Sequence, residues 1–329
     1  MSELVNEFQS YESIKNWRVH HLSQHLEDST ALNRFHDSVM RKTFDHALTR
    51  LGKGNPPCPY TWFITGSGGR MEQGMISDQD HGIIYENSNL ETQEYFLALG
   101  VELSYGLNIV GYPYCEGGIM CSNPLWSKSI EEWKVQISQW MKEASWSTIR
   151  YLQIFYDARR LVGTDSFIPE LKSFIHQFQK DNPRLLKRMM DNVMHMKTAI
   201  GPLGQLIVEE KGIHTGSIDL KYSAFLPYVN AVRILAIKEG ILDTATIDRL
   251  NRLIALPKYQ QELLDYKINF QKLFHYRLGL FQQADSYDDT HYLNIKHFSK
   301  EKKKELRKIL KDGKKLHQYV SGIIEKGVK

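Results

Sequence analysis

The segment from Thr61 to Tyr85, TWFITGSGGRMEQGMISDQDHGIIY, decides the fold of this 329-residue chain. Its first residues are aromatic and β-branched, which suits a buried strand, and we predict one from Tyr60 to Thr65. A glycine-rich turn and a short helix are expected next, because Gly66-Ser67-Gly68-Gly69 follows at once. A second predicted strand then opens with Asp78 and Asp80. This order indicates a small sheet with two carboxylates a short loop away from the glycine turn.

The glycine turn and the two carboxylates have complementary chemistry. Glycine lets a ligand approach the backbone, and free N–H groups at such a turn bind phosphate. Residues i and i+2 of a strand share a face at a separation of about 7 Å, which pairs Asp78 with Asp80. Two carboxylates beside a phosphate site can hold Mg²⁺ or Mn²⁺ against the phosphates of an NTP. We therefore predict a metal site at this pair and nucleotide contacts from Gly66, Ser67, Gly68 and Gly69.

The same residues resemble the nucleotidyltransferase fold of the DNA polymerase β superfamily, with Gly-Ser followed by Asp-x-Asp. The longer string GSGGRMEQGMISDQD is similar to a nucleotidyltransferase family of unknown substrate, which is related to the uridylyltransferase that modifies the PII signalling protein. Arg70 and Glu72 belong to this similarity. The resemblance implies catalysis by Asp78 and Asp80 with a divalent metal. Arg70 either neutralises charge on the triphosphate or locks the turn through Glu72.

Enzymes of the polymerase β type usually carry a third carboxylate that acts as base for the attacking hydroxyl. The resemblance offers two candidates for it. Glu116 follows a third strand that we predict at Asn108 to Tyr114, and the segment CEGGIM is itself similar to the family. Asp157 resembles an Asp-x-Arg element of the PII-modifying enzymes, although it could equally be an ion-pair partner that orients Arg159. Both remain candidate catalytic residues.

Composition narrows the class of protein. A hydrophobic share of 42% and a charged share of 24% are those of a globular chain, and a net charge of +4 argues against a dedicated nucleic-acid binder. No apolar run approaches the ~20 residues of a membrane span, and the polar N-terminus is unlike a signal peptide. Three cysteines without a CxxC pair favour a reducing, cytoplasmic setting. A homo-oligomer is compatible with these features.

The chain divides into three predicted parts within an α+β fold. Residues 1–55 have helical periodicity and end at a segment rich in glycine and proline. Residues 56–165 form the predicted nucleotidyltransferase domain, a small polymerase β-like sheet with flanking helices. Two helices are expected between 129 and 160, with Leu161-Val162-Gly163 closing this domain. Residues 166–329 are predicted to be an all-helical domain, with one helix over Pro183 to Ile200.

Lys221 is the predicted nucleotide-binding residue outside the glycine turn. It lies in Asp219-Leu220-Lys221, which resembles an element of the helical domain that accompanies this family. The resemblance implies that Lys221 reaches the triphosphate, whereas the residues alone also allow a structural ion network with Asp219 and Arg233. A basic stretch from Lys300 to Lys315 is predicted to be the solvated face of an amphipathic helix.

These features predict a Mg²⁺-dependent enzyme that transfers an NMP from an NTP to a hydroxyl group. The resemblance implies a regulatory transfer in signal transduction, to a protein or small-molecule acceptor that the sequence does not name. A nucleotide-sensing module with little or no catalysis is the alternative. A third reading, an RNA-end nucleotidyltransferase, is disfavoured by the mild net charge.

Overall fold

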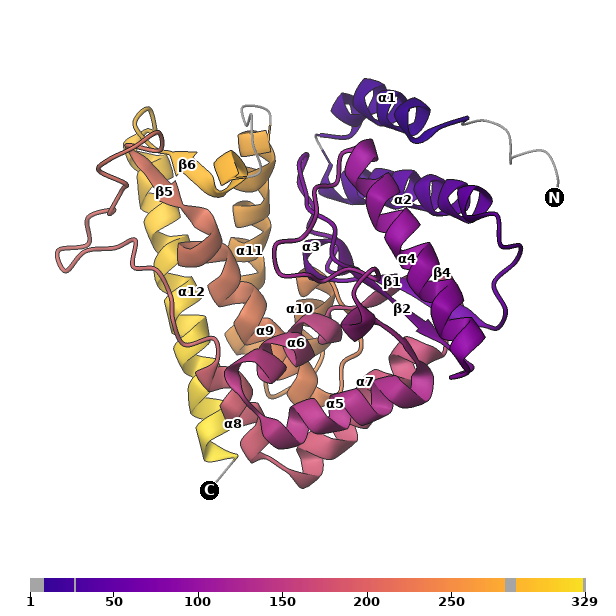
Figure 1. The fold of residues 1–329 in the computed structure, drawn as a ribbon. Coiled ribbons are helices and arrows are strands. Elements are labelled where there is room, and N and C mark those ends of the chain that lie inside the picture. The colour runs from indigo at the N-terminus through magenta and orange to yellow at the C-terminus, as the bar shows by residue number, and fades with distance from the viewer. Residues whose placement is uncertain (1–8, 27, 282–287, 328–329) are drawn as a thin grey trace. The chain divides into compact units, whose positions relative to one another are not determined.

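The protein is described by a computed structural model, which covers residues 9–26, 28–281 and 288–327 (Figure 1). The fold is mixed α+β, as the sequence predicts, and 62% helical with a small four-stranded sheet. Contacts divide the chain into two compact units. The first contains the described residues up to 139 together with 154–174, and the second contains 140–153 and the described residues from 175 onward.

The first unit is built on a mixed sheet in the order β3-β2-β1-β4. β1 pairs antiparallel with β2 and β4, whereas β2 and β3 are parallel. The strands are β1 (Tyr60–Ile64), β2 (His81–Tyr85), β3 (Ser127–Ser129) and β4 (Arg159–Gly163). Both central strands are almost wholly buried, which explains why aromatic and β-branched residues fill them.

The register of β1 and β2 fixes where the chemistry lies. Ile64 is opposite His81, and the ladder continues for one further bond from the Thr65 N–H to the Asp80 carbonyl at 2.9 Å. The glycine turn therefore follows the C-terminal end of β1, and the two aspartates precede the N-terminal end of β2. Both lie at the same end of this strand pair. The predicted proximity of these segments follows directly from the strand pairing.

Helices α2 and α4 contact this sheet at β4 and β3 respectively. α2 packs against α4, and α1 contacts both of them (Figure 1). The helices from residue 11 to residue 181 are α1 (Tyr11–Leu22), η1 (Ser23–His25), α2 (Ser29–Leu51), α3 (Gly66–Gly69), α4 (Leu90–Val110), η2 (Pro124–Trp126), α5 (Ile130–Glu143), α6 (Trp146–Tyr156) and α7 (Phe167–Asp181). Of these, α6 belongs mostly to the second unit, and α5 and α7 are divided between the two units. The expected N-terminal helices and the two helices between 129 and 160 are confirmed.

The predicted third strand at Asn108 to Tyr114 is wrong. α4 continues through its apolar residues to Val110 and ends at Gly111, whose φ of +109° terminates the helix. Beyond it, Tyr114 makes one isolated parallel bridge with Gln79. The remaining strands are β3 and β4 instead, and Leu161-Val162-Gly163 forms the end of β4.

The second unit is mostly helical, with one small antiparallel sheet of β5 and β6 that the sequence did not suggest. The helix expected over Pro183 to Ile200 ends early, at Asp191. The elements are α8 (Arg184–Asp191), β5 (Ser217–Asp219), the π-helix η3 (Lys221–Phe225), α9 (Leu226–Glu239), α10 (Thr246–Ile254), α11 (Gln260–Phe281), η4 (Asp288–His291), β6 (Tyr292–Asn294) and α12 (Lys300–Lys326).

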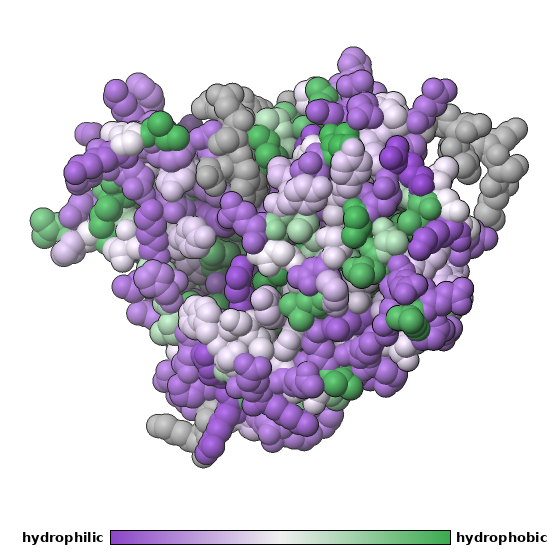
Figure 2. Space-filling view, viewed as in Figure 1, coloured by the Kyte–Doolittle hydropathy of each residue, from purple (hydrophilic) through white to green (hydrophobic). Residues whose placement is uncertain are grey.

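α12 bears out the prediction for the basic C-terminal stretch. Its apolar residues, among them Leu306 and Ile309, are buried while most of its lysines are exposed, and the helix packs against α9 and α11. On the face shown in Figure 2, hydrophilic residues predominate and hydrophobic ones form small separate groups. Within the described residues, no helix combines the length and apolar character needed to cross a membrane.

Candidate active site

The glycine turn requires glycine at two positions for different reasons. Gly66 has a φ of +56°, and a Cβ there would fall on the carboxylate of Asp80. Gly69 has no unusual φ, but a Cβ there would collide with the backbone carbonyl of Asp157. The turn therefore packs closely against Asp80 on one side and against the backbone of Asp157, before β4, on the other.

The two aspartates are oriented by Gln79, which lies between them, and by His81, which follows them. Gln79 and His81 are buried, and the Gln79 side-chain amide donates to the carbonyls of Ser104 at 3.1 Å and Tyr112 at 2.9 Å. Because that amide nitrogen is the donor, its oxygen accepts from His81 Nε2 at 2.9 Å. Alternation then turns the half-buried Asp78 and Asp80 to the opposite face.

The structure brings Asp78 and Asp80 together with Cys115. One carboxylate oxygen from each aspartate and the cysteine sulfur all lie within 4.8 Å of one another. Burial, followed by the charge of Asp80 and a hydrogen bond to it, raises the pKa of Cys115 to about 12. The thiol is therefore protonated at neutral pH. The sequence interpretation did not include Cys115 in the site.

The two candidates for the third acid occupy different environments. Glu116 follows Cys115 on the loop after α4 and is exposed. Asp157 lies between α6 and β4, is fully buried, and binds Arg70 Nη1 at 2.7 Å. Neither carboxylate joins the Asp78, Asp80 and Cys115 cluster among the described residues.

Arg70 is held by two carboxylates in the interior of the first unit. Its Nε donates to Glu72 and its Nη1 to Asp157, both at 2.7 Å. Burial opposes the charge of Arg70, but the two carboxylates outweigh burial and raise its pKa above the ordinary value. Since both ends of the guanidinium are engaged, the turn that carries Arg70 is tied to the chain entering β4.

A second arginine holds the turn from the other side. Arg159 at the start of β4 forms a bidentate pair with Asp37 of α2, at 2.6 and 2.8 Å, and its Nε donates to the Gly68 carbonyl at 3.0 Å. Asp37 is separated from Arg159 by 122 residues, and only its place in a buried stripe of α2 could have drawn attention to it. Arg159 thus connects the N-terminal helices to the glycine turn.

Ser67 lies within the turn and is half-buried. Its hydroxyl is 3.3 Å from that of Ser77, which also receives a hydrogen bond from the Gln73 side chain at 3.4 Å. The two serines link the turn to the segment that carries the aspartates. Ser77 was part of the family resemblance but was not assigned a role.

The loop between the turn and the aspartates is fixed by α1 and α2. Asn33 accepts from the Gln73 N–H at 2.9 Å, and Arg18 donates to the Met75 carbonyl at 3.0 Å. His36 Nε2 lies 2.9 Å from the Gly74 carbonyl and must donate to it, so Nδ1 accepts from the Tyr112 hydroxyl at 2.8 Å. The N-terminal helices are therefore part of the scaffold of the site.

Because His36 is buried in its neutral form, we predict that it makes the stability of the protein depend on pH. Burial, aided by Arg18, lowers the pKa of His36 to about 3, against about 6.5 in an unfolded chain. Below pH 6.5 only the unfolded chain takes up this proton, so stability is lost as the pH falls toward 3. Between pH 7 and pH 5, the free energy of unfolding should fall by about 2 kcal/mol less in His36→Gln than in the unmodified protein. Urea unfolding at both pH values measures this.

A matched control for that measurement is His20→Gln, because His20 is exposed on α1. This variant should lose as much stability between pH 7 and pH 5 as the unmodified protein. Equal pH dependence in His36→Gln and His20→Gln would show that His36 does not titrate on unfolding.

Lys221 belongs to the second unit, where it begins the π-helix η3. Its ammonium donates to His291 Nε2 at 3.3 Å, and burial followed by the charge of Lys221 lowers the pKa of His291 to about 3. Asp219, two residues earlier, accepts from Lys197 at 3.3 Å and from the Tyr222 N–H at 3.2 Å. Lys221 and Asp219 therefore each have polar partners within their own unit.

Two family models match the chain over separate regions. Residues 19–146 match the family described as Putative nucleotidyltransferase DUF294, and residues 183–323 match a Putative nucleotidyltransferase substrate binding domain. The first match contains the glycine turn, both aspartates, Cys115 and Glu116, and the second contains Lys221. No curated protein matches the chain. The chain belongs to the nucleotidyltransferase family that these two models describe.

Proposed function

We propose that the protein transfers a nucleoside monophosphate from an NTP to a hydroxyl group of a protein or small-molecule acceptor. The observation that carries this proposal is the pair Asp78 and Asp80, placed against the Gly66 turn by the pairing of β1 with β2. A regulatory role is part of the proposal. It rests on the resemblance to the uridylyltransferase that modifies the PII protein.

The donor set suits a hard divalent cation. Asp78 and Asp80 present carboxylate oxygens, which Mg²⁺ and Mn²⁺ prefer, and the absence of a Cβ at Gly66 lets the turn approach the Asp80 carboxylate closely. Asp78 and Asp80 would hold the metal, and the protonated Cys115 thiol would orient Asp80. When bound, a divalent cation supplies positive charge to the phosphate oxygens.

The glycine turn supplies the phosphate contacts in this proposal. The first backbone donor satisfied inside the turn is Gly69, which bonds to the Thr65 carbonyl at 2.8 Å. The N–H groups of Gly66, Ser67 and Gly68 precede it, and no side chain caps this start. These groups and the Ser67 hydroxyl would bind the β- and γ-phosphates and orient the α-phosphorus for attack.

Arg70 and Asp157 are assigned as positioning residues rather than as groups that touch the nucleotide. Their opposite charges pair in the interior, and together they hold the turn from which the phosphate contacts come. Arg159 and Asp37 support the same turn from the other side. We further propose residues 56–165 as the catalytic domain, 1–55 as its helical support and 166–329 as a helical domain that includes the nucleotide-binding Lys221.

Glu116 is our assignment for the base that takes the proton of the attacking hydroxyl. It is exposed and adjacent to Cys115, whereas the charge of Asp157 is compensated by Arg70. Glu116→Gln should lower the turnover number about 10²- to 10⁴-fold, the usual effect of removing a general base. NTP affinity should change little. Single-turnover transfer and NTP titration measure the two quantities separately.

The matched control for Glu116 is Glu143→Gln, a substitution at an exposed carboxylate near the end of α5. It should leave both quantities unchanged. A normal turnover number in Glu116→Gln would show that Glu116 is not the base. The mechanism would then have no assigned base.

A nucleotide-sensing module is the second candidate function. It is favoured by one observation, namely that neither Glu116 nor Asp157 joins the two aspartates among the described residues. A sensor would bind NTP only with Mg²⁺ and would transfer nothing to any component of a cell extract. An enzyme would bind NTP with Mg²⁺ and would also transfer the nucleotide to an acceptor. Parallel binding and transfer assays on the same preparation therefore separate the two functions.

A further inference from the structure

A cavity of about 640 Å³ lies in the second unit, between α12 and the irregular segment that joins α8 to β5. Its lining comes from most of the residues between 194 and 202, from Ile207, from Ser223 of η3, and from Leu310, Lys311 and Lys314 of α12. The volume falls within the range of about 300–1,000 Å³ that is typical of small-molecule sites. All of these residues lie within the match to the substrate-binding domain.

One side of this cavity is an apolar surface that is open to solvent. The irregular segment forms it, and the Met194 and Ile207 side chains there are 48% and 42% exposed. The backbone is held in a hairpin, because Ile200 and Leu206 form an antiparallel bridge and the Ile207 N–H donates to the Ala199 carbonyl at 2.9 Å. Exposed apolar side chains that gather on an ordered backbone are typical of a binding surface.

The α12 side of the cavity carries two ammonium groups. Lys311 and Lys314 are exposed, lie three residues apart on one face of the helix, and make no hydrogen bond or ion pair within the described residues. Two lysines on another face of α12, Lys308 and Lys315, instead pair with Asp312 at 2.8 and 3.7 Å. The cavity therefore borders the side of α12 whose positive charge is not neutralised.

The position of Lys311 brings this charge to the hairpin. A Cβ added at Gly204, inside the hairpin, would lie 3.9 Å from the Lys311 ammonium. Arg307 lies one turn earlier on the same side of α12, and its Nε is buried with no hydrogen-bond partner in the described part of the chain. An anionic group bound beside the hairpin would thus face positive charge on α12.

Other polar side chains of the cavity have partners of their own. Lys197 donates to Glu209 at 2.5 Å and to Asp219 at 3.3 Å, and the Ser223 hydroxyl donates to the Asp219 carbonyl. Among the described residues that line the cavity, none is acidic and none is aromatic. The lining therefore suits an aliphatic ligand with a negative charge, and it offers no ring on which a base could stack.

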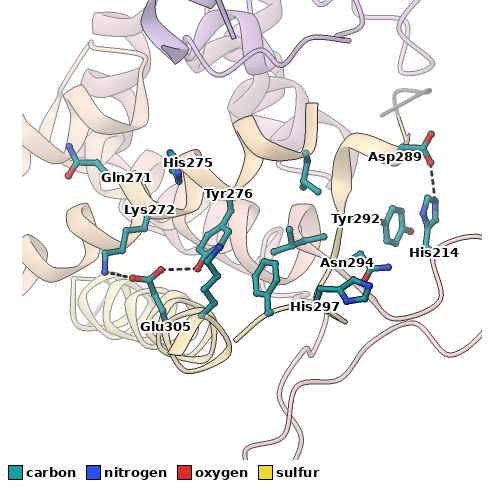
Figure 3. Close-up of a pocket in the computed structure, with 14 residues that line it drawn as sticks. His214, Gln271, Lys272, His275, Tyr276, Asp289, Tyr292, Asn294, His297 and Glu305 are labelled. Atoms are coloured by element: carbon teal, nitrogen blue, oxygen red, sulfur yellow. Dashed lines mark hydrogen bonds and ion pairs between the residues drawn. The ribbon is translucent and has the colours of Figure 1, made fainter. Parts of the chain in front are cut away.

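The larger cavity of the same unit, about 1150 Å³, has a different distribution of charge (Figure 3). There Glu305 accepts hydrogen bonds from the Lys272 ammonium and the Tyr276 hydroxyl, and His275 and His297 lie at opposite ends, as Figure 3 shows. Its polar groups do not gather positive charge on one side. The smaller cavity is thus the one that combines an apolar surface with neighbouring cations.

We propose that the cavity between α12 and the hairpin binds an anionic amphiphile, an unbranched acyl chain that ends in a carboxylate. The chain would lie against Met194, Ile200 and Ile207, and the carboxylate would bind Lys311 and Lys314. Methionine is unbranched and flexible, so Met194 can adapt to chains of different length. The proposal does not rest on nucleotidyl transfer at the aspartate pair.

The test is calorimetric titration of the full chain with hexanoate, octanoate and decanoate, without NTP or divalent metal. Binding of one equivalent is expected, with affinity rising about fourfold for each additional buried CH₂. Octan-1-ol, which has the chain without the charge, and acetate, which has the charge without the chain, should both bind more weakly than octanoate. Met194→Ser should weaken decanoate binding, because it removes apolar surface from the cavity.

The double variant Lys311→Ala with Lys314→Ala should bind decanoate about tenfold more weakly, the loss expected for two partly exposed ion pairs. Its matched control is Lys300→Ala with Lys304→Ala, which removes two exposed lysines from the same helix, neither of which lines the cavity. The control should bind decanoate like the parent. Both double variants change the net charge equally, so a difference between them reports the cavity itself.

The proposal is overturned by absence of decanoate binding, by affinity that does not depend on chain length, or by equal affinity in the two double variants. If a second copy of the chain covered the apolar surface instead, the protein would sediment as a dimer that Met194→Ser dissociates, and decanoate would not bind. Since neither NTP nor metal is present, these outcomes are separate from failure of the proposed function.

Discussion

Replacing Asp80 by Asn should lower nucleotidyl transfer about 10³-fold, which corresponds to about 4 kcal/mol of lost transition-state stabilisation. Asn has the shape of Asp but not its charge, so the packing against Gly66 is kept while half of the carboxylate pair is lost. Metal-dependent NTP binding should weaken in parallel. Steady-state transfer rates and NTP titrations with and without Mg²⁺ measure both effects.

Glu86→Gln is the control for this substitution. Glu86 is an exposed carboxylate that directly follows β2, whereas Asp80 directly precedes that strand. The control should match the unmodified protein in transfer and in thermal stability. If Asp80→Asn and Glu86→Gln were equally active, Asp80 would not be a metal ligand and the site assignment would be wrong.

Replacing Arg70 by Met should destabilise the protein by about 3–5 kcal/mol, the usual cost of breaking a buried ion pair. The loss is large because Glu72 and Asp157 would both remain charged in the interior without their partner. The glycine turn should also lose its position, so transfer should fall even in the folded fraction. Urea unfolding followed by fluorescence gives the free energy directly.

Arg160→Met is the control, because Arg160 on β4 forms an ion pair that is exposed rather than buried. The pair between Arg160 and Asp165 has side chains that are 42% and 83% exposed, and such surface pairs contribute about 0–1 kcal/mol. The triple variant with Arg70→Met, Glu72→Gln and Asp157→Asn should recover part of the lost stability, because no unpaired charge remains. A cost for Arg70→Met no larger than for Arg160→Met would contradict the proposed network.

The central strands and the carboxylate pair could be predicted because their signals are local. Aromatic and β-branched residues define β1, the glycines define the turn, and the two-residue spacing of Asp78 and Asp80 puts them on one face. The third strand was misplaced although the signal that decides it is also local. The apolar run that ends at Val110 continues a helix, and only the cap at Gly111 distinguishes the two readings.

Apart from the pairing of Arg70 with Glu72, which the sequence offered as one of two roles for Arg70, the support of the site was not predictable from local pattern. Arg159 bonds to Asp37 across 122 residues, and Arg70 bonds to Asp157 across 87. Sequence spacing carries no information about partners at such separations. Cys115 is a comparable case, because a single cysteine after an irregular loop gives no sign that it will lie beside two aspartates.

The most direct test of the central claim compares NTP labelled at the α-phosphate with NTP labelled at the γ-phosphate. The protein and its Asp80→Asn variant are incubated with each NTP, with Mg²⁺ or Mn²⁺, and with extract of the source cell. Nucleotidyl transfer predicts α-label on an acceptor and γ-label in pyrophosphate, with both lost in Asp80→Asn. Label on an acceptor from the γ-phosphate, or no transfer of α-label at all, would contradict the account.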